Sequence, residues 1–267
     1  MDFLQKLEKA ITKNDSLVCV GLDPDTDKIS EGYKSKDKPL FEFNKSIIDA
    51  TRGSVCAYKP NSAFYEAGGA GGIQELKDTC DYIKNTCPEI PIILDYKRGD
   101  IGNTNAKYAQ FAFEYLRADA VTLQPYQGGK ALDAFYGYKD KGLFIWAKAS
   151  NEDSGEFQNL EMEGRPLYEH VAKAFVGKWN ENGNIMFVAG ATYPQELKRI
   201  REIAGDDTPI LVPGIGAQGG DLETMLKAGL NSQGKGLIIN SSRGIIYGKD
   251  PAKAAEELKN QINTSSQ

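Results

Sequence analysis

The fold can be inferred from the stretch Ile92-Ile93-Leu94-Asp95-Tyr96-Lys97-Arg98-Gly99-Asp100-Ile101-Gly102-Asn103-Thr104. It begins with three bulky aliphatic residues and no polar interruption, which is typical of a strand buried on both faces. Asp95 and Lys97 stand two positions apart where this strand ends. If the strand continues, their side chains lie on one face while Tyr96 points the other way. The stretch therefore predicts a buried strand that carries two opposite charges at its end.

A turn and a helix are expected directly after these charges. Gly99 allows the chain to turn, and Asp100 brings a second carboxylate five positions after the first. Asn103 or Thr104 is expected to cap a helix that starts near Asn105. Charges at the end of a buried strand are costly to remove from water unless they neutralise one another. A structural salt bridge would meet that condition, but we favour an acid–base centre held by a rigid strand.

Short apolar segments of the same kind recur along the chain and alternate with helical periodicity. Thirty-six residues separate Asp23 from Lys59 and again Lys59 from Asp95, and no change of composition divides the chain. This pattern predicts an α/β fold, a (β/α)8 TIM barrel with an extra N-terminal helix, as a single domain over residues 1–267. An open doubly wound sheet is the alternative, which the number of strands disfavours.

The expected elements cover most of the chain. Strands are expected at residues 16–22, 54–58, 92–95, 120–123, 142–148, 184–188, 209–213 and 236–240. Helices are expected at residues 2–13, 38–52, 72–86, 105–116, 166–179, 194–204 and 251–262. The run of glycines at residues 68–72 has no strand directly before it, and we interpret it as a flexible loop.

Composition and charge argue against several classes of protein. The chain has 267 residues, of which 40% are hydrophobic and 26% charged, as in an ordinary globular protein. Its net charge of −5, with no basic run, disfavours a nucleic-acid partner. No segment approaches the roughly 18 apolar residues that a membrane span needs, and no signal peptide is recognised. The four cysteines form no C-x-x-C pair, so reduced cysteines, a cytoplasmic location and no membrane partner are expected.

The single histidine excludes two common kinds of active site. His170 lies in an expected helix, away from any strand end, so a surface or packing role is expected. A Ser-His-Asp triad would have to use this residue, and a zinc site made mostly of imidazoles cannot be built. The chemistry must therefore rely on Asp, Lys and Arg side chains, and no metal site is expected.

Polar side chains follow several of the expected strands. In a barrel of parallel strands the catalytic face lies at the carboxyl ends of the strands. Taken singly, a charged residue at a strand end is more often structural or solvated than functional. Six such residues would converge on one mouth, and this convergence favours a functional site: Asp23, Lys59, Asp95, Lys97, Lys148 and Ser150.

Glycine- and serine-rich turns follow the last two strands. They read Pro213-Gly214-Ile215-Gly216-Ala217-Gln218-Gly219-Gly220-Asp221 and Asn240-Ser241-Ser242-Arg243-Gly244. The first contains a G-x-G-x-x-G spacing, but a dinucleotide site is disfavoured because it follows the seventh strand and no acidic residue closes the eighth. Free backbone amides and one guanidinium suit a single phosphate group, bound after strands seven and eight as in many barrels. Tight turns without a ligand are the structural alternative.

Together these motifs resemble the orotidine 5′-phosphate decarboxylase family, in its longer bacterial-type branch. The resemblance rests on Asp95-x-Lys97-Arg98-x-Asp100-Ile101-x-x-Thr104, on Pro213-Gly214-Ile215-Gly216-Ala217-Gln218 and on Arg243. It extends to Gly21-Leu22-Asp23-Pro24, Tyr58-Lys59-Pro60-Asn61 and Lys148-Ala149-Ser150-Asn151, so it covers nearly the whole chain. The D-x-K-x-x-D element alone is shared with sugar-phosphate decarboxylases and aldolases of the same superfamily.

The resemblance implies cofactor-free decarboxylation of orotidine 5′-phosphate to uridine 5′-phosphate, the last step of UMP biosynthesis, by a homodimer with shared active sites. It implies that Lys97 stabilises and then protonates the C6 carbanion, and that Asp95 faces the substrate carboxylate. Lys59 and Asp100 would complete an alternating array of charges, with Asp100 and Thr104 supplied by the partner subunit. It further implies that Asp23 binds ribose hydroxyls and that Ser150 binds the pyrimidine edge. Gln218 and Arg243 would bind the phosphate, and the turns that hold them contain Pro213, Gly214 and Ser242.

Two other functions stay open. A metal-dependent 3-keto-L-gulonate 6-phosphate decarboxylase or hexulose-phosphate synthase would use the same scaffold and would lose activity in EDTA. A catalytically silent phosphate-binding barrel, serving as a subunit or regulator, is the alternative from a different class. Lys97 flanked by Asp95 and Asp100 disfavours it, because a silent barrel has no need of that array.

Overall fold

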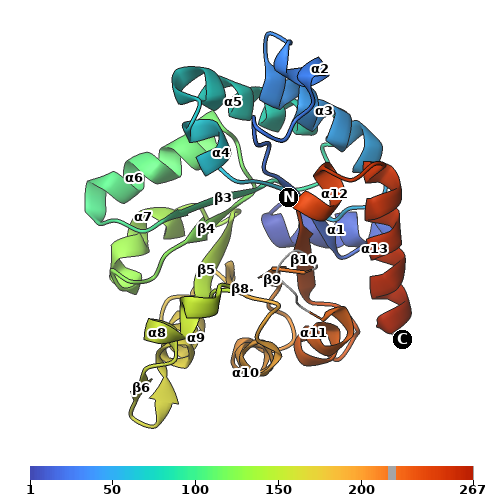
Figure 1. Ribbon diagram of the computed structural model, residues 1–267. Coiled ribbons are helices and arrows are strands. Elements are labelled where there is room, and N and C mark those ends of the chain that lie inside the picture. The colour runs from blue at the N-terminus through green and yellow to red at the C-terminus, as the bar shows by residue number, and fades with distance from the viewer. Residues whose placement is uncertain (216–220, 267) are drawn as a thin grey trace.

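The computed structural model describes residues 1–215 and 221–266, in which eight parallel strands form one sheet in the order β2-β1-β10-β9-β8-β5-β4-β3 (Figure 1). Bridges from Tyr58 to Ile92 and from Asn61 to Asp95 bring the two outer strands together, so the sheet is a nearly closed barrel. The strands are β1 (Val18–Leu22), β2 (Ala57–Pro60), β3 (Ile93–Arg98), β4 (Ala120–Leu123), β5 (Gly142–Lys148), β8 (Ile185–Ala189), β9 (Ile210–Pro213) and β10 (Leu237–Ser241).

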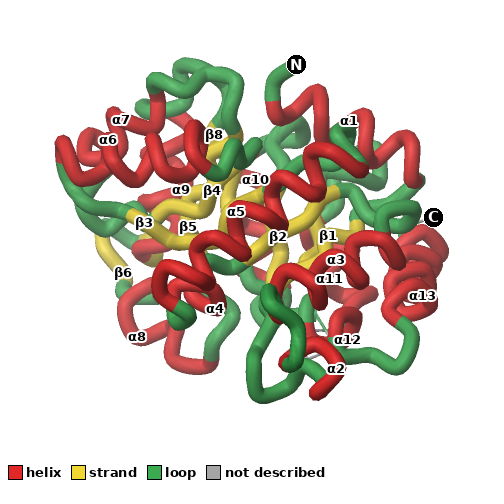
Figure 2. Tube along the Cα trace, turned by 90° about the horizontal axis from the view of Figure 1, so that it is seen from above, coloured by secondary structure: helices red, strands yellow, loops and turns green. Residues whose placement is uncertain are grey.

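Helices form a ring around these strands (Figure 1), and in Figure 2, turned by 90°, the strands lie between helices. Three of the longer ones, α3, α10 and α13, carry proline in the first turn, where its missing N–H is not needed. Within the described residues, no helix is long and apolar enough to cross a membrane. The helices are α1 (Phe3–Asn14), α2 (Glu31–Lys34), α3 (Pro39–Thr51), α4 (Ala63–Glu66), α5 (Gly69–Thr86), α6 (Gly102–Gln110), η1 (Phe111–Tyr115), η2 (Gly129–Leu132), α7 (Asp133–Tyr136), η3 (Glu152–Ser154), α8 (Gly155–Gln158), α9 (Leu167–Gly177), α10 (Pro194–Ala204), α11 (Leu222–Gly229), α12 (Arg243–Ile246) and α13 (Pro251–Ser265).

The expected α/β barrel with an extra N-terminal helix is confirmed, and the open doubly wound sheet is wrong. The expected limits of β4, β5 and α10 coincide with the observed ones, and the other strands shift by a few residues. The largest shift is in β2, whose pairing with β1 begins at Ala57 and extends past Lys59. Lys59 therefore stands within the strand, where its backbone is fixed on both sides.

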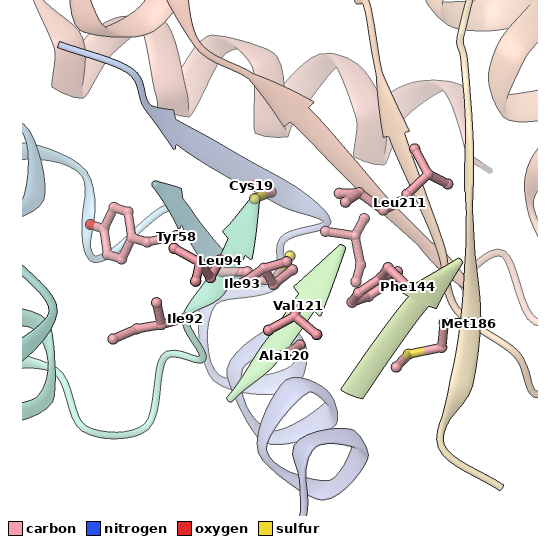
Figure 3. Packing of buried hydrophobic residues seen from close by; sticks show 14 of the residues in the cluster. Cys19, Tyr58, Ile92, Ile93, Leu94, Ala120, Val121, Phe144, Met186 and Leu211 are labelled. Atoms are coloured by element: carbon pink, nitrogen blue, oxygen red, sulfur yellow. The ribbon is translucent and has the colours of Figure 1, made fainter. Parts of the chain in front are cut away.

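The core consists of buried hydrophobic residues from the strands and from the helices packed around them. Figure 3 shows Cys19, Leu94, Val121, Phe144 and Leu211, which come from five different strands, packed in this core. Strands buried on both faces have no polar face, which is why the sequence shows continuous apolar runs and not an alternating pattern. The same packing makes the carboxyl ends of the strands a rigid base for side chains.

The glycine-rich run at residues 68–72 is helical, so its interpretation as a flexible loop is wrong. Helix α5 begins at Gly69, directly after the short helix α4. A Cβ atom on Gly72 would lie 1.9 Å from the carbonyl oxygen of Tyr65, so glycine lets the two helices approach closely. The glycines serve helix packing here, which a propensity argument cannot reveal.

A segment between β5 and α9 contains elements that the sequence pattern did not predict. It comprises η3, α8 and an antiparallel hairpin of β6 (Glu161–Met162) and β7 (Arg165–Pro166). Strands of two residues are too short for hydrophobic periodicity to reveal them. His170 contacts this hairpin, with its Nε2 2.7 Å from the carbonyl oxygen of Met162, which supports the packing role expected for it.

The N-terminal helix α1 is attached to the barrel through a buried carboxylate. Asp119, just before β4, accepts hydrogen bonds from the Nζ atoms of Lys6 and Lys84 at 2.9 and 3.0 Å and from the backbone N–H of Ile92 at 2.9 Å. The side chains of Asp119 and both lysines are at most 16% exposed, so these ion pairs are weakly screened by solvent. This cluster links three segments far apart in sequence.

Asp119→Asn is expected to destabilise the fold by about 3 kcal/mol at pH 7, because it leaves two buried ammonium groups without a counter-charge. Burial raises the pKa of the Asp119 carboxyl, but Lys6 and Lys84 outweigh burial and hold that pKa below its ordinary value. A carboxyl whose pKa is lower in the folded than in the unfolded protein stabilises the fold at pH values above its unfolded-state pKa of about 4. This contribution is lost as the pH falls below that value toward the folded-state pKa.

Urea unfolding of both proteins at pH 7 and pH 3 measures this effect. The difference between wild type and variant should be large at pH 7 and smaller at pH 3. Glu257→Gln, which removes an exposed carboxylate paired with Lys253, is the matched control and should cost less than about 0.5 kcal/mol. An equal loss at both pH values would contradict an electrostatic origin.

Candidate active site

A cavity opens at the carboxyl ends of the strands. Side chains from β2, β3 and β5 and from the segments after β1, β9 and β10 line it. Among the expected site residues it contains Asp23, Lys59, Asp95, Lys97, Ser150, Pro213, Gly214, Ser242 and Arg243. Of the six polar strand-end residues expected to meet at one mouth, five therefore do so: Asp23, Lys59, Asp95, Lys97 and Ser150.

Asp95 is the centre of the charged part of the cavity. Its Oδ2 accepts a hydrogen bond from Lys59 Nζ at 2.8 Å, and its Oδ1 accepts one from Lys97 Nζ at 2.6 Å. The hydroxyl of Thr122 on β4 donates to Oδ1 at 3.0 Å. One carboxylate thus holds two ammonium groups, and these side chains come from three neighbouring strands.

Burial and charge together set the protonation states of this array. Burial of the Asp95 carboxyl alone would raise its pKa, but Lys59 and Lys97 outweigh burial and hold the pKa well below its ordinary value. For Lys59, burial alone would lower the pKa, whereas Asp95 and Asp23 raise it above the ordinary value for lysine. Burial raises the pKa of Asp23, although Lys59 opposes that shift. Asp95 is therefore a carboxylate and Lys59 an ammonium at neutral pH.

Lys97 has an unusual backbone conformation. Its φ is +47°, in the left-handed region, and the pairing of β3 with β4 is irregular between Leu94 and Arg98. A non-glycine residue there costs about 1–2 kcal/mol, and such strain gathers at functional sites. The side chains of Asp95 and Lys97 meet as expected, but through this irregularity and not through a regular strand.

Gly99 was expected because glycine allows the chain to turn. The structure gives a different reason for a glycine at this position. The left-handed residue of this segment is Lys97, while Gly99 is needed because a Cβ atom there would lie 2.3 Å from the carbonyl oxygen of Gln124. With glycine, the backbone N–H of Gln124 can pair with the carbonyl oxygen of Arg98 at 2.8 Å. The chain after β3 is thereby pressed against the end of β4.

The other end of the cavity is formed by the turns after β9 and β10. Pro213, Gly214 (φ +102°), Ser242 and Arg243 line it, and Gln218 lies outside the described residues. Within the described part of the chain, Asp23 Oδ1 and Asn240 Oδ1 are buried without a hydrogen-bond partner, while the hydroxyl of Ser242 lies beside the Asp23 carboxyl and opposes the rise of its pKa. Buried polar atoms are rarely left unpaired, so this end is suited to a ligand that supplies hydrogen-bond donors.

Comparison with known proteins places the chain in a family. Residues 16–258 match the family model described as "Orotidine 5'-phosphate decarboxylase / HUMPS family". This chain belongs to that family. The orotidine 5′-phosphate decarboxylase of Cellvibrio japonicus is 46% identical over 99% of both chains, and that of Dechloromonas aromatica is 48% identical over 99% of this chain and 97% of its own. The solved OMP decarboxylase of Leishmania donovani is 40% identical, with a TM-score of 0.89 over 100% of this chain and 99% of its own.

Among the described residues that were expected at the site, three do not line this chain's cavity: Asp100, Thr104 and Lys148. Asp100 follows β3, and Thr104 lies exposed in the first turn of α6. The backbone N–H and carbonyl of Asp100 are both held by the side chain of Asn105, at 3.0 and 2.5 Å. The expected cap is wrong, because α6 begins at Gly102 and has no side-chain cap, while Asn105 binds the preceding loop instead.

Lys148 was expected at the mouth and is instead fully buried beside it. Its Nζ donates to Asn159 Oδ1 at 3.0 Å and lies 4.6 Å from the ring centre of Tyr193. Burial lowers the pKa of Lys148, although Glu196 opposes that shift. In a regular strand the side chains of Trp146 and Lys148, two positions apart, would lie on one face. The pairing of β5 with β8 is irregular between these two residues, and this irregularity separates their side chains.

The segment that follows β8 fixes the position of Ser150. Its carbonyl oxygen accepts a hydrogen bond from the hydroxyl of Thr192 at 2.8 Å. A Cβ atom on Gly190 would lie 2.6 Å from the Cα of Ser150, so only glycine permits this contact. Gly190 lies outside the recognised motifs, so the sequence gave no indication that it packs against Ser150.

Sequence reasoning missed several residues that line the cavity. Trp146 lies inside an apolar strand, four others lie outside the quoted motifs, and Asn61 and Ile215 stood in quoted motifs without an assigned role. Asn240 stood in a quoted motif but was given no role, although an amide in an apolar strand is a usable signal. The missed residues are Asp25, Lys28, Asn61, Phe64, Trp146, Ile215, Asn240 and Tyr247.

Proposed function

We propose that this chain decarboxylates orotidine 5′-phosphate to uridine 5′-phosphate, the last step of de novo pyrimidine biosynthesis. The observation that supports this most is the Lys59–Asp95–Lys97 array, which faces a cavity whose other end carries Arg243 and unpaired polar atoms. Relatives named orotidine 5′-phosphate decarboxylase cover nearly the whole chain. We also propose that residues 1–267 form one domain and that the protein acts in the cytoplasm, in keeping with four buried free cysteines.

Loss of carbon dioxide from C6 of the orotate ring leaves a carbanion, so the site has to supply positive charge. Lys97 is the proposed source: its ammonium stabilises the developing carbanion and then protonates it. Its side chain is 34% exposed, whereas that of Lys59 on the other side of Asp95 is 4% exposed. Lys97 is therefore the lysine of this array that can reach a ligand, and Lys59 holds Asp95 in its ionised form.

Asp95 is proposed to lie against the substrate carboxylate, where the repulsion is relieved as carbon dioxide leaves. Two unit charges about 4 Å apart interact by roughly 4 kcal/mol at an effective dielectric of about 20. Enzymes lower barriers by roughly 8–23 kcal/mol, so this repulsion alone is too small. Stabilisation of the carbanion by Lys97 in a closed, dry site has to contribute more.

The remaining substrate contacts are proposed by position. Asp23, with its buried unpaired Oδ1, suits ribose hydroxyls, and Ser150 suits the pyrimidine edge. Arg243 is proposed to hold the phosphate together with Gln218, in the turns of Pro213, Gly214 and Ser242. Binding of the phosphate, remote from the reacting carbon, would supply free energy for organising the site.

A homodimer with shared sites is part of the proposal. Asp100 and Thr104 lie outside this chain's cavity but belong to the same motif as Lys97. The surface near them exposes a large aliphatic side chain, since Ile101 is 61% exposed. We propose that this surface contacts the partner subunit and that Asp100 and Thr104 complete the partner's site, with Asp100 next to the partner's Lys97.

The direct test is to mix pure protein with orotidine 5′-phosphate in EDTA and follow the ultraviolet absorbance. The absorbance should fall as product forms, because the proposed chemistry uses no metal. Activity on a sugar phosphate that disappears in EDTA would favour the metal-dependent decarboxylases or synthases of the superfamily. Binding of the nucleotide without turnover would favour a silent barrel.

Arg243→Ala should weaken capture of the phosphate-bearing substrate by about 1.5–3 kcal/mol, the size of a charge-assisted hydrogen bond. The effect is expected in kcat/KM for orotidine 5′-phosphate and hardly at all for orotidine, which lacks the phosphate. Arg165→Ala, on the exposed hairpin strand β7, is a control that should change neither value. Equal losses for both substrates would show that Arg243 does not bind the phosphate.

A further inference from the structure

Trp146 brings an aromatic face to the charged array. It lies on β5 and lines the cavity, and the Nζ atom of Lys97 lies 4.5 Å from the centre of its ring. An ammonium over an indole face is attracted by the ring quadrupole, and tryptophan gives the strongest such interaction among the aromatic residues. Lys97 thus has two neighbours that favour its positive charge, Asp95 from β3 and Trp146 from β5.

The contacts of the Lys97 ammonium explain why a second neighbour matters. The described residues provide one hydrogen-bond acceptor to Nζ, Asp95 Oδ1, although an ammonium has three N–H groups. Of the other charged groups nearby, Lys59 on β2 pairs with Asp95, and Asp23 after β1 acts on Lys59 and Lys97 through its charge without a hydrogen bond to the Lys97 ammonium. The indole attracts the charge without accepting an N–H bond, so the remaining N–H groups stay available to a ligand.

We propose that Trp146 is a positioning residue for Lys97, which holds the ammonium over the cavity where it can meet the reacting carbon. The proposal rests on the proposed decarboxylation for its catalytic consequence. Lys97 has a long flexible side chain on a strained backbone and is 34% exposed, and within its own chain a single ion pair, with Asp95, restrains it. The indole adds a second restraint from β5, and a proton donor placed in advance lowers the barrier to the chemical step.

The kinetic test compares Trp146→Leu with Trp146→Phe in the intact protein. Trp146→Leu should lower kcat by about tenfold, because the aromatic face is lost. The KM and the dissociation constant of uridine 5′-phosphate should change by less than about twofold, since the phosphate and ribose contacts stay. Trp146→Phe keeps a weaker aromatic face and should recover kcat to within about threefold of wild type. Equal losses for Leu and Phe, or a rise of KM at unchanged kcat, would overturn the proposal.

A spectroscopic test does not depend on turnover. The chain has two tryptophans, and Trp179, stacked on Tyr136 outside the cavity, is first replaced by Phe so that Trp146 alone emits. A protonated amine over an indole quenches its fluorescence by excited-state proton transfer. Lys97→Met in this background should therefore raise the emission. Lys148→Met is the matched control. It removes a buried lysine from β5, the strand of Trp146, but this lysine lies over Tyr193, so the emission of Trp146 should stay unchanged.

The two tests separate the possible failures. Unchanged emission in the Lys97→Met variant would overturn the contact between Lys97 and Trp146, whatever the protein catalyses. A clear rise in emission together with no turnover of orotidine 5′-phosphate by the wild type would keep the contact and reject the proposed function. A thermal melt of each variant shows that the comparison is made between folded proteins.

Discussion

Lys97→Ala is expected to lower the rate of decarboxylation by at least about 10⁴-fold while the protein stays folded. The variant lacks both the charge that stabilises the carbanion and the proton donor. Asp95 keeps its hydrogen bonds to Lys59 and Thr122, so no buried carboxylate is left unpaired. Turnover measured beside a thermal melt tests both parts of this expectation.

Lys97→Gly provides the matched control for the backbone. Glycine adopts a φ of +47° without strain, so this variant should be at least as stable as Lys97→Ala and equally inactive. Activity near that of wild type in either variant would remove Lys97 from its role as proton donor. Loss of activity that is accompanied by unfolding in both would mean that Lys97 acts through the fold.

The fold could be predicted because each strand of this barrel is buried on both faces. That burial requires continuous apolar runs such as 92–94 and 142–147, which stand out in a sequence without an alignment. The charged residues that end such runs stand out for the same reason, since they interrupt an apolar pattern. Asp23, Lys59, Asp95 and Lys97 were placed in one cavity by this argument, and the structure brings them together.

What the sequence could not reveal depends on contacts between segments far apart along the chain. The left-handed backbone of Lys97 and the displacement of Lys148 both arise where strand pairing becomes irregular. The helix at the glycine run depends on the close approach of Tyr65 to Gly72. Trp146 was hidden because an aromatic residue in an apolar strand is normally a core residue, and its contact with Lys97 becomes visible only when β3 and β5 are placed in space.

The shared site leads to the second large effect, which appears on mixing two inactive variants. In a two-fold dimer each site would combine Lys97 of one chain with Asp100 of the other. Lys97→Ala and Asp100→Ala homodimers should both be nearly inactive, because every site in each lacks one charge. Equal amounts mixed with subunit exchange give about half mixed dimers, in which one site carries both substitutions and the other carries none. About a quarter of all sites then have the wild-type residues, and activity should rise from near zero toward that fraction.

A mixture of Lys97→Ala with Asp95→Ala is the matched control, because Asp95 and Lys97 are in contact within one chain. Every site of the mixed dimer then keeps one substitution, so mixing should restore nothing. If Asp100 acted in the site of its own chain, the first mixture would behave like this control. Exchange is verified independently by the mass of differently tagged subunits. Recovery in the Lys97–Asp100 mixture and none in the Lys97–Asp95 mixture would therefore assign Asp100 to the partner's site. Two inactive mixtures would refute that assignment, but they would leave the Lys59–Asp95–Lys97 array as it stands.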